Sequence, residues 1–159
     1  MDPSHFFFNE AISTGLMIYE EYLWTRGSMK GMIWVADATG ITTGHVGRIN
    51  LPSLKKLIYY VQDALPIRLK GIHIINTSPI VEVIYNMVKP FISAEFINLT
   101  HFHTSLQSAS EYFPIELLPN ERGGKAGSIQ EFIDANYKRM ENCRKWFLED
   151  EKNNRVNES

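Results

Sequence analysis

The stretch from residue 30 to residue 76 constrains the fold of this chain more than any other. It contains two apolar runs of strand length, Met32–Ala36 and Gly71–Asn76, which are separated by a helical pattern. An apolar run without alternation is typical of a strand that is buried on both faces, as in a parallel sheet. Two such strands with a helix between them form a βαβ crossover. The sequence therefore predicts an α/β fold with a mostly parallel β-sheet and flanking helices.

Apolar residues at spacings of three and four predict the helices that flank this sheet. We expect helices over residues 4–24, 52–65 and 80–91, with Gly27 ending the first and Pro66 ending the second. The helix over residues 80–91 is apolar and follows the second strand, so it lies at the carboxyl edge of the sheet. An apolar helix over an apolar sheet edge favours a covered cavity, and hence a carrier over an enzyme.

The remaining segments are expected to complete the domain. Ser128 and Glu131 form the capping-box pattern that begins a last helix. A third strand is expected at Ile97–Phe102, a loop at Gly40–Gly47, and a polar tail that frays at Glu149–Ser159.

Composition and charge narrow the class of protein. The chain has 159 residues, which favours one domain, and a net charge of −2, which gives no basic field for nucleic acid. Cys143 is the only cysteine, so no intrachain disulfide forms, as is usual in the cytoplasm. The first residues lack the basic start of a secretory signal, and no apolar run reaches the roughly 20 residues that span a membrane. We expect a cytoplasmic monomer whose membrane contact is peripheral and transient.

Catalytic motifs do not emerge from the sequence. The G-x-S-x-G nucleophile motif is not present, and Cys143 lies in a predicted helix with no histidine nearby. Asp37 follows a buried strand, where an acid can serve a site, although a turn or helix-capping carboxylate explains it equally well. The sequence predicts that the protein is not an enzyme and takes no cofactor, with an α/β enzyme of unrecognised site as an alternative.

Two groups of polar residues have both a functional and a structural interpretation. His101 and His103 are two apart on an expected strand, so they lie on one face and could share a metal. No third ligand is placed by the sequence, and packed or surface histidines are the favoured interpretation, so we expect no metal site. The glycines of Gly40–Gly47 could hold a phosphate, but they lack the order of known phosphate loops. Arg68 and Lys70 could form a small anion-binding patch or ordinary solvated surface.

Four ordered blocks of sequence resemble the CRAL-TRIO lipid-binding domain family, in its branch of tocopherol- and retinaldehyde-binding proteins with many insect members. They are Gly31–Asp37 with Gly40 and His45, Pro66–Asn76, Lys89–Phe91 and Leu118–Gly124, and together they cover roughly residues 2–127. The resemblance implies a non-enzymatic carrier that holds one hydrophobic ligand between the sheet and a mobile gate helix. It divides the chain into a lipid-binding domain at 1–127, a packed C-terminal helix at 128–148 and a tail at 149–159.

The resemblance also implies which residues form the site. The gate corresponds to residues 79–98. Apart from the resemblance, we expect Tyr60 or His73 to orient one hydroxyl or carbonyl of the ligand. Trp34 and Tyr60 are bulky, which disfavours the largest ligands. The expected lining of the apolar pocket is Met32, Trp34, Ala36, Ile49, Leu57, Tyr60, Val61, Leu65, Ile67, Leu69, Ile72, Val83, Met87 and Phe91.

The chain departs from the family pattern in three places. The family has an N-terminal helical domain and one more strand before Asp2, so a truncated form without function is an alternative expectation. Arg68 and Lys70 match two positions of a phosphoinositide-binding cluster, whereas Glu95 and Leu99 occupy the other two positions. Arg122 stands where the last block usually has tyrosine. A regulatory or protein-interaction module with weak phosphoinositide binding is the other alternative to a lipid carrier.

Overall fold

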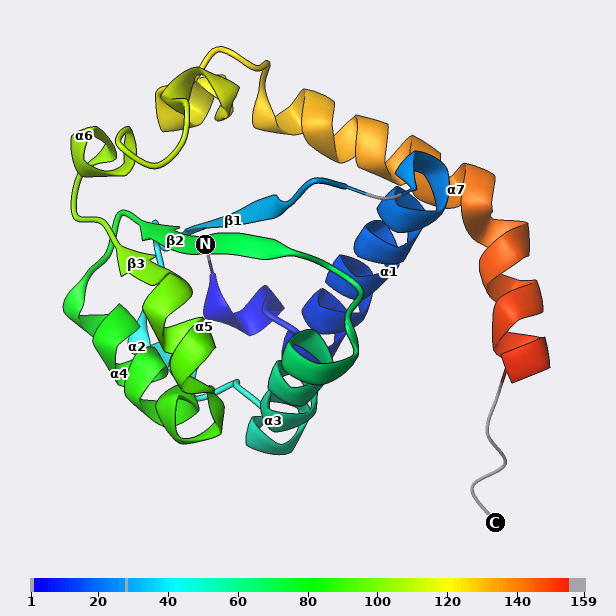
Figure 1. Cartoon of the computed structure of the whole chain (residues 1–159), viewed down its shortest axis with the longest axis horizontal. Helices are drawn as coiled ribbons and strands as arrows, with labels where there is room; N and C mark the ends of the chain where they lie inside the picture. The colour runs from blue at the N-terminus through cyan, green and yellow to red at the C-terminus, as the bar shows by residue number, and fades with distance from the viewer. Residues whose placement is uncertain (1, 28, 155–159) are drawn as a thin grey trace. The chain divides into compact units, whose positions relative to one another are not determined.

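The computed structural model describes residues 2–27 and 29–154 and divides the chain into two compact units (Figure 1). The first unit comprises Met1–Thr14 and Ser28–Ile115, and the second comprises Gly15–Gly27 and Glu116–Ser159. Helix α1 (Phe8–Arg26) contributes residues to both units. The first unit contains the sheet and the regions for which the sequence predicts a site.

Three parallel strands form the sheet in the order β1-β2-β3. They are β1 (Met32–Asp37), β2 (Leu69–Ile75) and β3 (Thr100–Phe102). The crossover between β1 and β2 contains the helix α3 (Leu51–Tyr59), whose cap is Asn50. The predicted α/β fold with a parallel sheet is therefore confirmed, and β2 is the central strand of the three.

Strand β1 corrects one expectation about burial. Ile33 is 40% exposed and Val35 is 37% exposed, although the apolar run predicts a strand buried on both faces. Within the described residues β1 pairs with β2 alone and forms an edge of the sheet. An apolar sequence shows that a strand can be buried on both faces. Whether it is buried depends on which elements pack against it.

The first predicted helix starts later than expected. Residues Pro3–His5 form a separate 3₁₀ turn, η1, and Asp2 accepts a hydrogen bond of 2.8 Å from the backbone N–H of Ser4. Helix α1 then begins at Phe8 and ends at Arg26, and Gly27 donates a backbone hydrogen bond of 2.9 Å to the Leu23 carbonyl. The expected helix start at residue 4 is wrong because the Asp2 cap closes a short turn before α1.

Two other local predictions need correction. The expected loop at Gly40–Gly47 contains a one-turn helix, α2 (Thr43–Val46), stabilised by a capping box between Thr42 and His45. The expected strand Ile97–Phe102 begins as the helix α5 (Ala94–Leu99), because Ser93 caps that helix by accepting a hydrogen bond from the Phe96 N–H. Only Thr100–Phe102 remains as strand.

The first part of the segment between β2 and β3, residues 79–91, follows the prediction closely. Helix α4 (Pro79–Val88) continues into a 3₁₀ turn, η3 (Lys89–Phe91), and then into α5. Tyr85 of α4 packs edge-to-face on Phe102 of β3, with ring centroids 4.9 Å apart, so α4 covers the face of the sheet that Phe102 presents (Figure 1). The opposite face carries His73, which packs on Phe113 beyond the short helix α6 (Leu106–Ala109).

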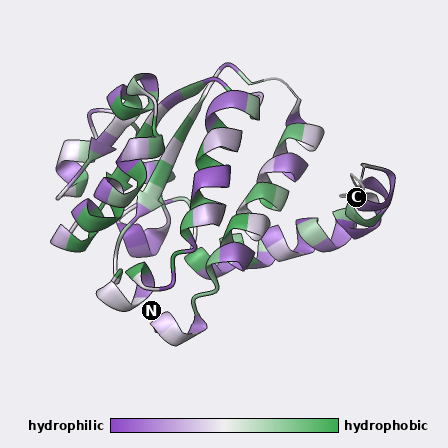
Figure 2. Cartoon of the chain, turned by 90° about the horizontal axis from the view of Figure 1, so that it is seen from below, coloured by the Kyte–Doolittle hydropathy of each residue, from purple (hydrophilic) through white to green (hydrophobic). Residues whose placement is uncertain are grey.

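In the second unit the long helix α7 (Ile129–Asn154) is the main element. The predicted capping box is confirmed, since Ser128 N–H donates to Glu131 at 2.6 Å and Glu131 N–H donates to the Ser128 hydroxyl at 3.2 Å. The helix continues to Asn154, so the expectation of a frayed tail from Glu149 is wrong for Glu149–Asn154. Hydrophilic residues predominate in its last turns (Figure 2). The rest of the expected tail lies outside the described residues.

A tight loop precedes α7 and gives the first prediction. A Cβ atom at Gly124 would lie 1.8 Å from the Leu118 carbonyl oxygen, so no side chain fits without backbone movement. We expect Gly124→Ala to lower the free energy of unfolding by about 1–3 kcal/mol, as overpacking does. Urea unfolding followed by circular dichroism measures this change.

Gly47→Ala is the matched control, because a Cβ there meets only two carbonyl oxygens at 3.8 Å. Gly47 has ordinary helical backbone angles, so alanine should leave stability unchanged or slightly higher. Equal stability of the two variants would contradict the close packing of Gly124 on Leu118.

Candidate functional site

The carboxyl ends of β1 and β2 are joined by a polar contact. Asn76 donates a side-chain hydrogen bond of 2.9 Å to Asp37, and Thr39 donates two more to the same carboxylate oxygen, at 3.0 Å from its N–H and 2.6 Å from its hydroxyl. Asn76 adopts the left-handed region with a φ of 55°. These contacts favour the structural interpretation of Asp37, as a carboxylate that fixes the turn after β1 and holds the sheet edge.

A cavity of about 430 Å³ opens at this edge of the sheet, between the start of α4 and the end of β3. Its volume falls in the range of about 300–1,000 Å³ that is usual for small-molecule sites. The rings of Tyr85 and Phe102 supply aromatic surface, and threonine and serine hydroxyls supply polar groups at its rim. The lining residues are Thr77, Ser78, Pro79, Val81, Glu82, Tyr85, Phe102 and Thr104.

Helix α4 is apolar on two opposite sides. Val81 is buried and Tyr85 packs on Phe102, so this side of the helix faces the sheet. Val83 lies two residues from Val81, about 200° around the helix, and is 47% exposed. Met87 follows Val83 on the same stripe and is partly exposed. A helix with apolar residues on both sides is usually covered on both. The stripe formed by Val83 and Met87, called the second stripe below, is therefore available for a further apolar contact.

The expected pocket residues on the strands share one face of the sheet. Trp34 pairs with Ile72 in the register of β1 and β2, so their side chains point to the same side, together with Met32 and Ala36. The Trp34 ring nitrogen donates to the Met32 sulfur at 2.8 Å. This face is the one that Phe102 and α4 share, because Phe102 pairs with Ile74, which lies two residues after Ile72.

Most of the fourteen expected pocket residues keep some exposure. Only Leu65 is buried, Ala36 and Val83 are exposed, and the others are partly exposed. None of the fourteen lines the 430 Å³ cavity at the sheet edge. That these residues bind a ligand stays a prediction. One related expectation changes: His73 alternates with Ile72 on β2 and so points to the opposite face, away from this expected pocket.

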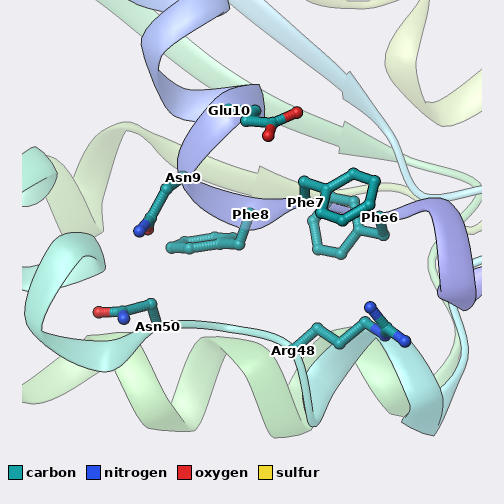
Figure 3. Close-up of a pocket in the computed structure, with 7 residues that line it drawn as sticks. All are labelled: Phe6, Phe7, Phe8, Asn9, Glu10, Arg48 and Asn50. Carbon is teal, nitrogen blue, oxygen red and sulfur yellow. The ribbon is translucent and has the colours of Figure 1, made fainter.

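A second cavity of about 380 Å³ lies between the start of α1 and the loop that enters α3 (Figure 3). Figure 3 shows the rings of three consecutive phenylalanines along one wall and the side chains of Arg48 and Asn50 along the other. Asn50 also accepts a hydrogen bond of 3.0 Å from Ser53 N–H, so its oxygen is already used as a helix cap. The lining residues are Phe6, Phe7, Phe8, Asn9, Glu10, Arg48 and Asn50. The run of phenylalanines is the one sequence signal for this cavity.

A buried histidine cluster occupies the other face of the sheet. His73 is 2% exposed and His103 is 3% exposed, and the His73 ring stacks on His101 at 5.0 Å and on His103 at 5.2 Å. The prediction that His101 and His103 share a face is confirmed. A Cβ at Gly71 would lie 2.6 Å from the His73 ring, so glycine is needed there. No group of three or more potential metal ligands that could hold an ion occurs in residues 2–27 and 29–154.

The hydrogen bonds of His73 and His103 are compatible with two neutral rings. The Ser108 hydroxyl donates to the Ser105 carbonyl at 2.8 Å, so its oxygen must accept from His103 Nδ1–H at 3.3 Å. His103 Nε2 then has no proton and accepts from His73 Nδ1–H at 2.9 Å. A proton added to His103 Nε2 would face the His73 N–H unless His73 changed its tautomer, so this arrangement disfavours the charged form of His103.

The pKa values agree with this arrangement. Burial, and next the neighbouring His101 and His103, lower the pKa of His73 below the usual value. Burial, and next His101, lower the pKa of His103. The cluster therefore ties β2 to the segment after β3 in its uncharged state.

Arg68 and Lys70, the candidate headgroup residues, are exposed at the start of β2. The Lys70 stem crosses Gly31, where a Cβ would lie 2.7 Å from Lys70 Cγ. The two residues are neighbours on the surface by their spacing, and their role stays a prediction. In the part of the chain that the structure describes, no helix has the length and apolar content needed to cross a membrane.

Comparison with known proteins identifies the class to which this fold belongs. Residues 1–124 match the family model described as the CRAL/TRIO domain. The chain is therefore a member of the CRAL/TRIO family, as the sequence blocks predicted.

The match to each individual relative covers only part of the length of that relative. The alpha-tocopherol transfer protein-like protein of Mus musculus is 30% identical over 129 residues, which are 80% of this chain and 38% of that protein. Clavesin-2 of Homo sapiens is 26% identical over 97 residues, which are 60% of this chain and 30% of that protein. A solved structure described as the crystal structure of Sfh5 has a TM-score of 0.44 and 14% identity, with 66% of this chain and 42% of that chain covered. The chain thus spans less than half the length of these relatives.

The histidine cluster gives the second prediction. Because the folded-state pKa values of His73 and His103 are lowered, these two rings bind fewer protons than in the unfolded chain once the pH falls through the ordinary histidine pKa of about 6.5. Since the unfolded state then binds more protons, the free energy of unfolding should fall as the pH drops from 7.5 to 5.5. Urea unfolding at a series of pH values measures the slope.

His73→Gln keeps an N–H for His103 but removes one titrating ring, so the slope should become shallower. Gln107→Asn, at an exposed position that carries no titrating group, should leave the slope unchanged. A stability that does not vary between pH 7.5 and 5.5 would contradict the neutral cluster.

Proposed function

We propose that this chain binds a small hydrophobic lipid and transfers it between membranes by movement of α4. The observation that carries the proposal is the second apolar stripe of α4, in which Val83 is 47% exposed although the opposite stripe packs on the sheet. Membership of the CRAL/TRIO family supports it, and so does the name of the tocopherol transfer protein-like relative. The proposed ligand class is a tocopherol-like or retinoid-like molecule or a phospholipid.

The proposed pocket lies between the Trp34 face of the sheet, α3 and the segment from α4 to α5. The register of Trp34 with Ile72 supports it, because it brings apolar groups of two strands to one face. The partial exposure of the expected lining residues supports it as well, because a face that holds a ligand keeps apolar surface accessible. Few polar groups are needed, and Tyr60 on the crossover is the one proposed to orient a ligand hydroxyl or carbonyl.

The energetics of opening favour release at a membrane. Full burial of each of the six apolar gate side chains is worth roughly 1.5–3 kcal/mol. All six keep some exposure in the closed arrangement, so the cost of opening into water is at most on the order of 10 kcal/mol. A bilayer interface can take up the same side chains and removes much of this cost. The gate would therefore stay closed in the cytoplasm and open during transient membrane contact. The six side chains are Ile80, Val83, Ile84, Met87, Val88 and Phe91.

The basic pair Arg68 and Lys70 is the proposed headgroup contact. Both side chains are exposed, and ammonium and guanidinium groups attract anionic phosphates at a bilayer surface. Glu95 and Leu99 supply no positive charge on α5, so two basic residues alone would give weak phosphoinositide binding. The role of the protein is then that of a carrier rather than of a catalyst.

A charge on the second stripe tests this proposal. We expect Met87→Asp to lower the rate of transfer of a fluorescent tocopherol or phospholipid between vesicles by about tenfold or more, because a carboxylate on the exposed stripe of α4 resists entry into the bilayer interface. Transfer is measured by dequenching as the lipid leaves donor vesicles, and vesicle binding is measured by flotation. Asn86→Asp is the control, since Asn86 is exposed on the same helix and acquires the same charge.

Wild-type rates for the control together with a large loss for Met87→Asp would support the gate. Unchanged transfer and vesicle binding in Met87→Asp would contradict it. If the wild-type chain binds phosphoinositide vesicles and transfers no lipid, a regulatory module replaces the carrier.

A further inference from the structure

The side chain of Gln62 bridges two backbone groups at the junction between η3 and α5. Its amide nitrogen donates to the Phe91 carbonyl at 3.1 Å, and its amide oxygen accepts from the Ser93 N–H at 2.6 Å. These contacts connect residues 29 and 31 positions apart in the sequence. Both ends of one side-chain amide are thus used to hold one short segment.

An irregular turn directs Gln62 toward this segment. The helix α3 passes into a π-helical turn (Tyr60–Ala64), in which Leu65 N–H donates to the Tyr60 carbonyl at 2.9 Å. A π-turn widens the helix and changes the direction of its side chains, and such turns are frequent at functional sites. Gln62 lies in the middle of this turn and is partly buried. The turn therefore has a specific consequence, which is the contact of Gln62 with the Phe91–Ser93 segment.

The segment that Gln62 holds is the link between the two helices of the expected gate. Helix α4 leads through η3 to Phe91, and Ile92 and Ser93 connect η3 to α5. Pro90 has no N–H, which reduces the local hydrogen bonds available to this link. The Lys55 ammonium lies 5.4 Å from the Phe91 ring centroid, so α3 contacts the link a second time. An outward movement of α4 that carries the Phe91–Ser93 link with it has to break or stretch the Gln62 bridge.

We propose that Gln62 is a latch that holds the α4–α5 link against the crossover helix and sets how readily the gate opens. This inference rests on the proposed function for its effect on lipid transfer, whereas the local effect on the link does not depend on it. Gln62 is a positioning residue, because its side-chain amide holds the backbone of the link at Phe91 and Ser93. The latch is local, so its loss should loosen the link without unfolding the domain.

The experiment compares Gln62→Leu and Gln62→Glu with the wild-type chain. Leucine keeps the size of the side chain and removes both hydrogen bonds. Glutamate keeps the acceptor for Ser93 N–H at neutral pH but cannot donate to the Phe91 carbonyl until it is protonated. Gln107→Leu is the matched control, because Gln107 is exposed on α6. Amide hydrogen exchange in residues 88–96, urea stability and vesicle-to-vesicle lipid transfer are measured for each chain.

We expect Gln62→Leu to speed exchange at the Ser93 amide by about tenfold, which corresponds to about 1.4 kcal/mol. Lipid transfer should become faster by a similar factor, and exchange in β2 should not change. For Gln62→Glu, amide exchange in residues 88–96 should be faster than in the wild type at neutral pH. The two exchange rates should become equal as the pH falls to about 4.3 and below, because a glutamate protonates there. If residue 62 only filled space, the exchange rate of Gln62→Glu would not return to the wild-type value at acidic pH.

Exchange at Ser93 that is equal in Gln62→Leu and the wild type would overturn the latch. Fast exchange that appears equally in β2 would also overturn it, because the effect would be global. If the wild-type chain transfers no lipid, the proposed function fails, while the exchange data still decide whether Gln62 holds the link.

Discussion

The parallel pairing of β2 with strands on both sides is the interaction on which the rest of the first unit depends. It places the two sequence-distant strands β1 and β3 beside one strand, and it fixes which side chains share a face. Because β2 alternates, Ile72 and Ile74 face α4, whereas His73 and Ile75 face the segment around Phe113. The apolar face and the buried polar cluster are therefore consequences of one register. The Asp37–Asn76 contact closes the carboxyl end of the same pair of strands.

The two faces of the sheet differ in their packing and polarity. The face with His73 is closed by hydrogen-bonded rings whose neutral state is maintained by burial, and it gives the sheet a fixed side. The face with Trp34 carries apolar groups that remain partly exposed, under a helix with apolar residues on both sides. A fixed side and an open apolar side suit a protein that holds a hydrophobic molecule and lets one helix move. The Gln62 bridge is the polar contact that would oppose this movement.

Local signals in the sequence predicted local structure well. The Ser128–Glu131 capping box needs only residues three apart, and the apolar stripe of α4 needs only helical spacing, so both were predictable. Burial of β1 was not predictable, since an apolar run does not say how many neighbours a strand has. Residues 97–99 were misassigned because the Ser93 cap outweighs their apolar pattern. The contacts of His73 with His103 and of Gln62 with Phe91 join residues about thirty apart, and no spacing rule reaches that far. The expected pocket residues follow from the family resemblance, and ligand binding itself is what tests them.

The central claim is that the Trp34 face of the sheet, together with α4, holds one lipid molecule. Organic extraction and mass spectrometry of the purified, folded chain test it most directly, after incubation with a mixed lipid extract and removal of free lipid. We predict that the folded chain retains one class of hydrophobic lipid at close to one molecule per chain and loses it on unfolding. A chain that unfolds cooperatively and yet retains no lipid after this incubation would contradict the account.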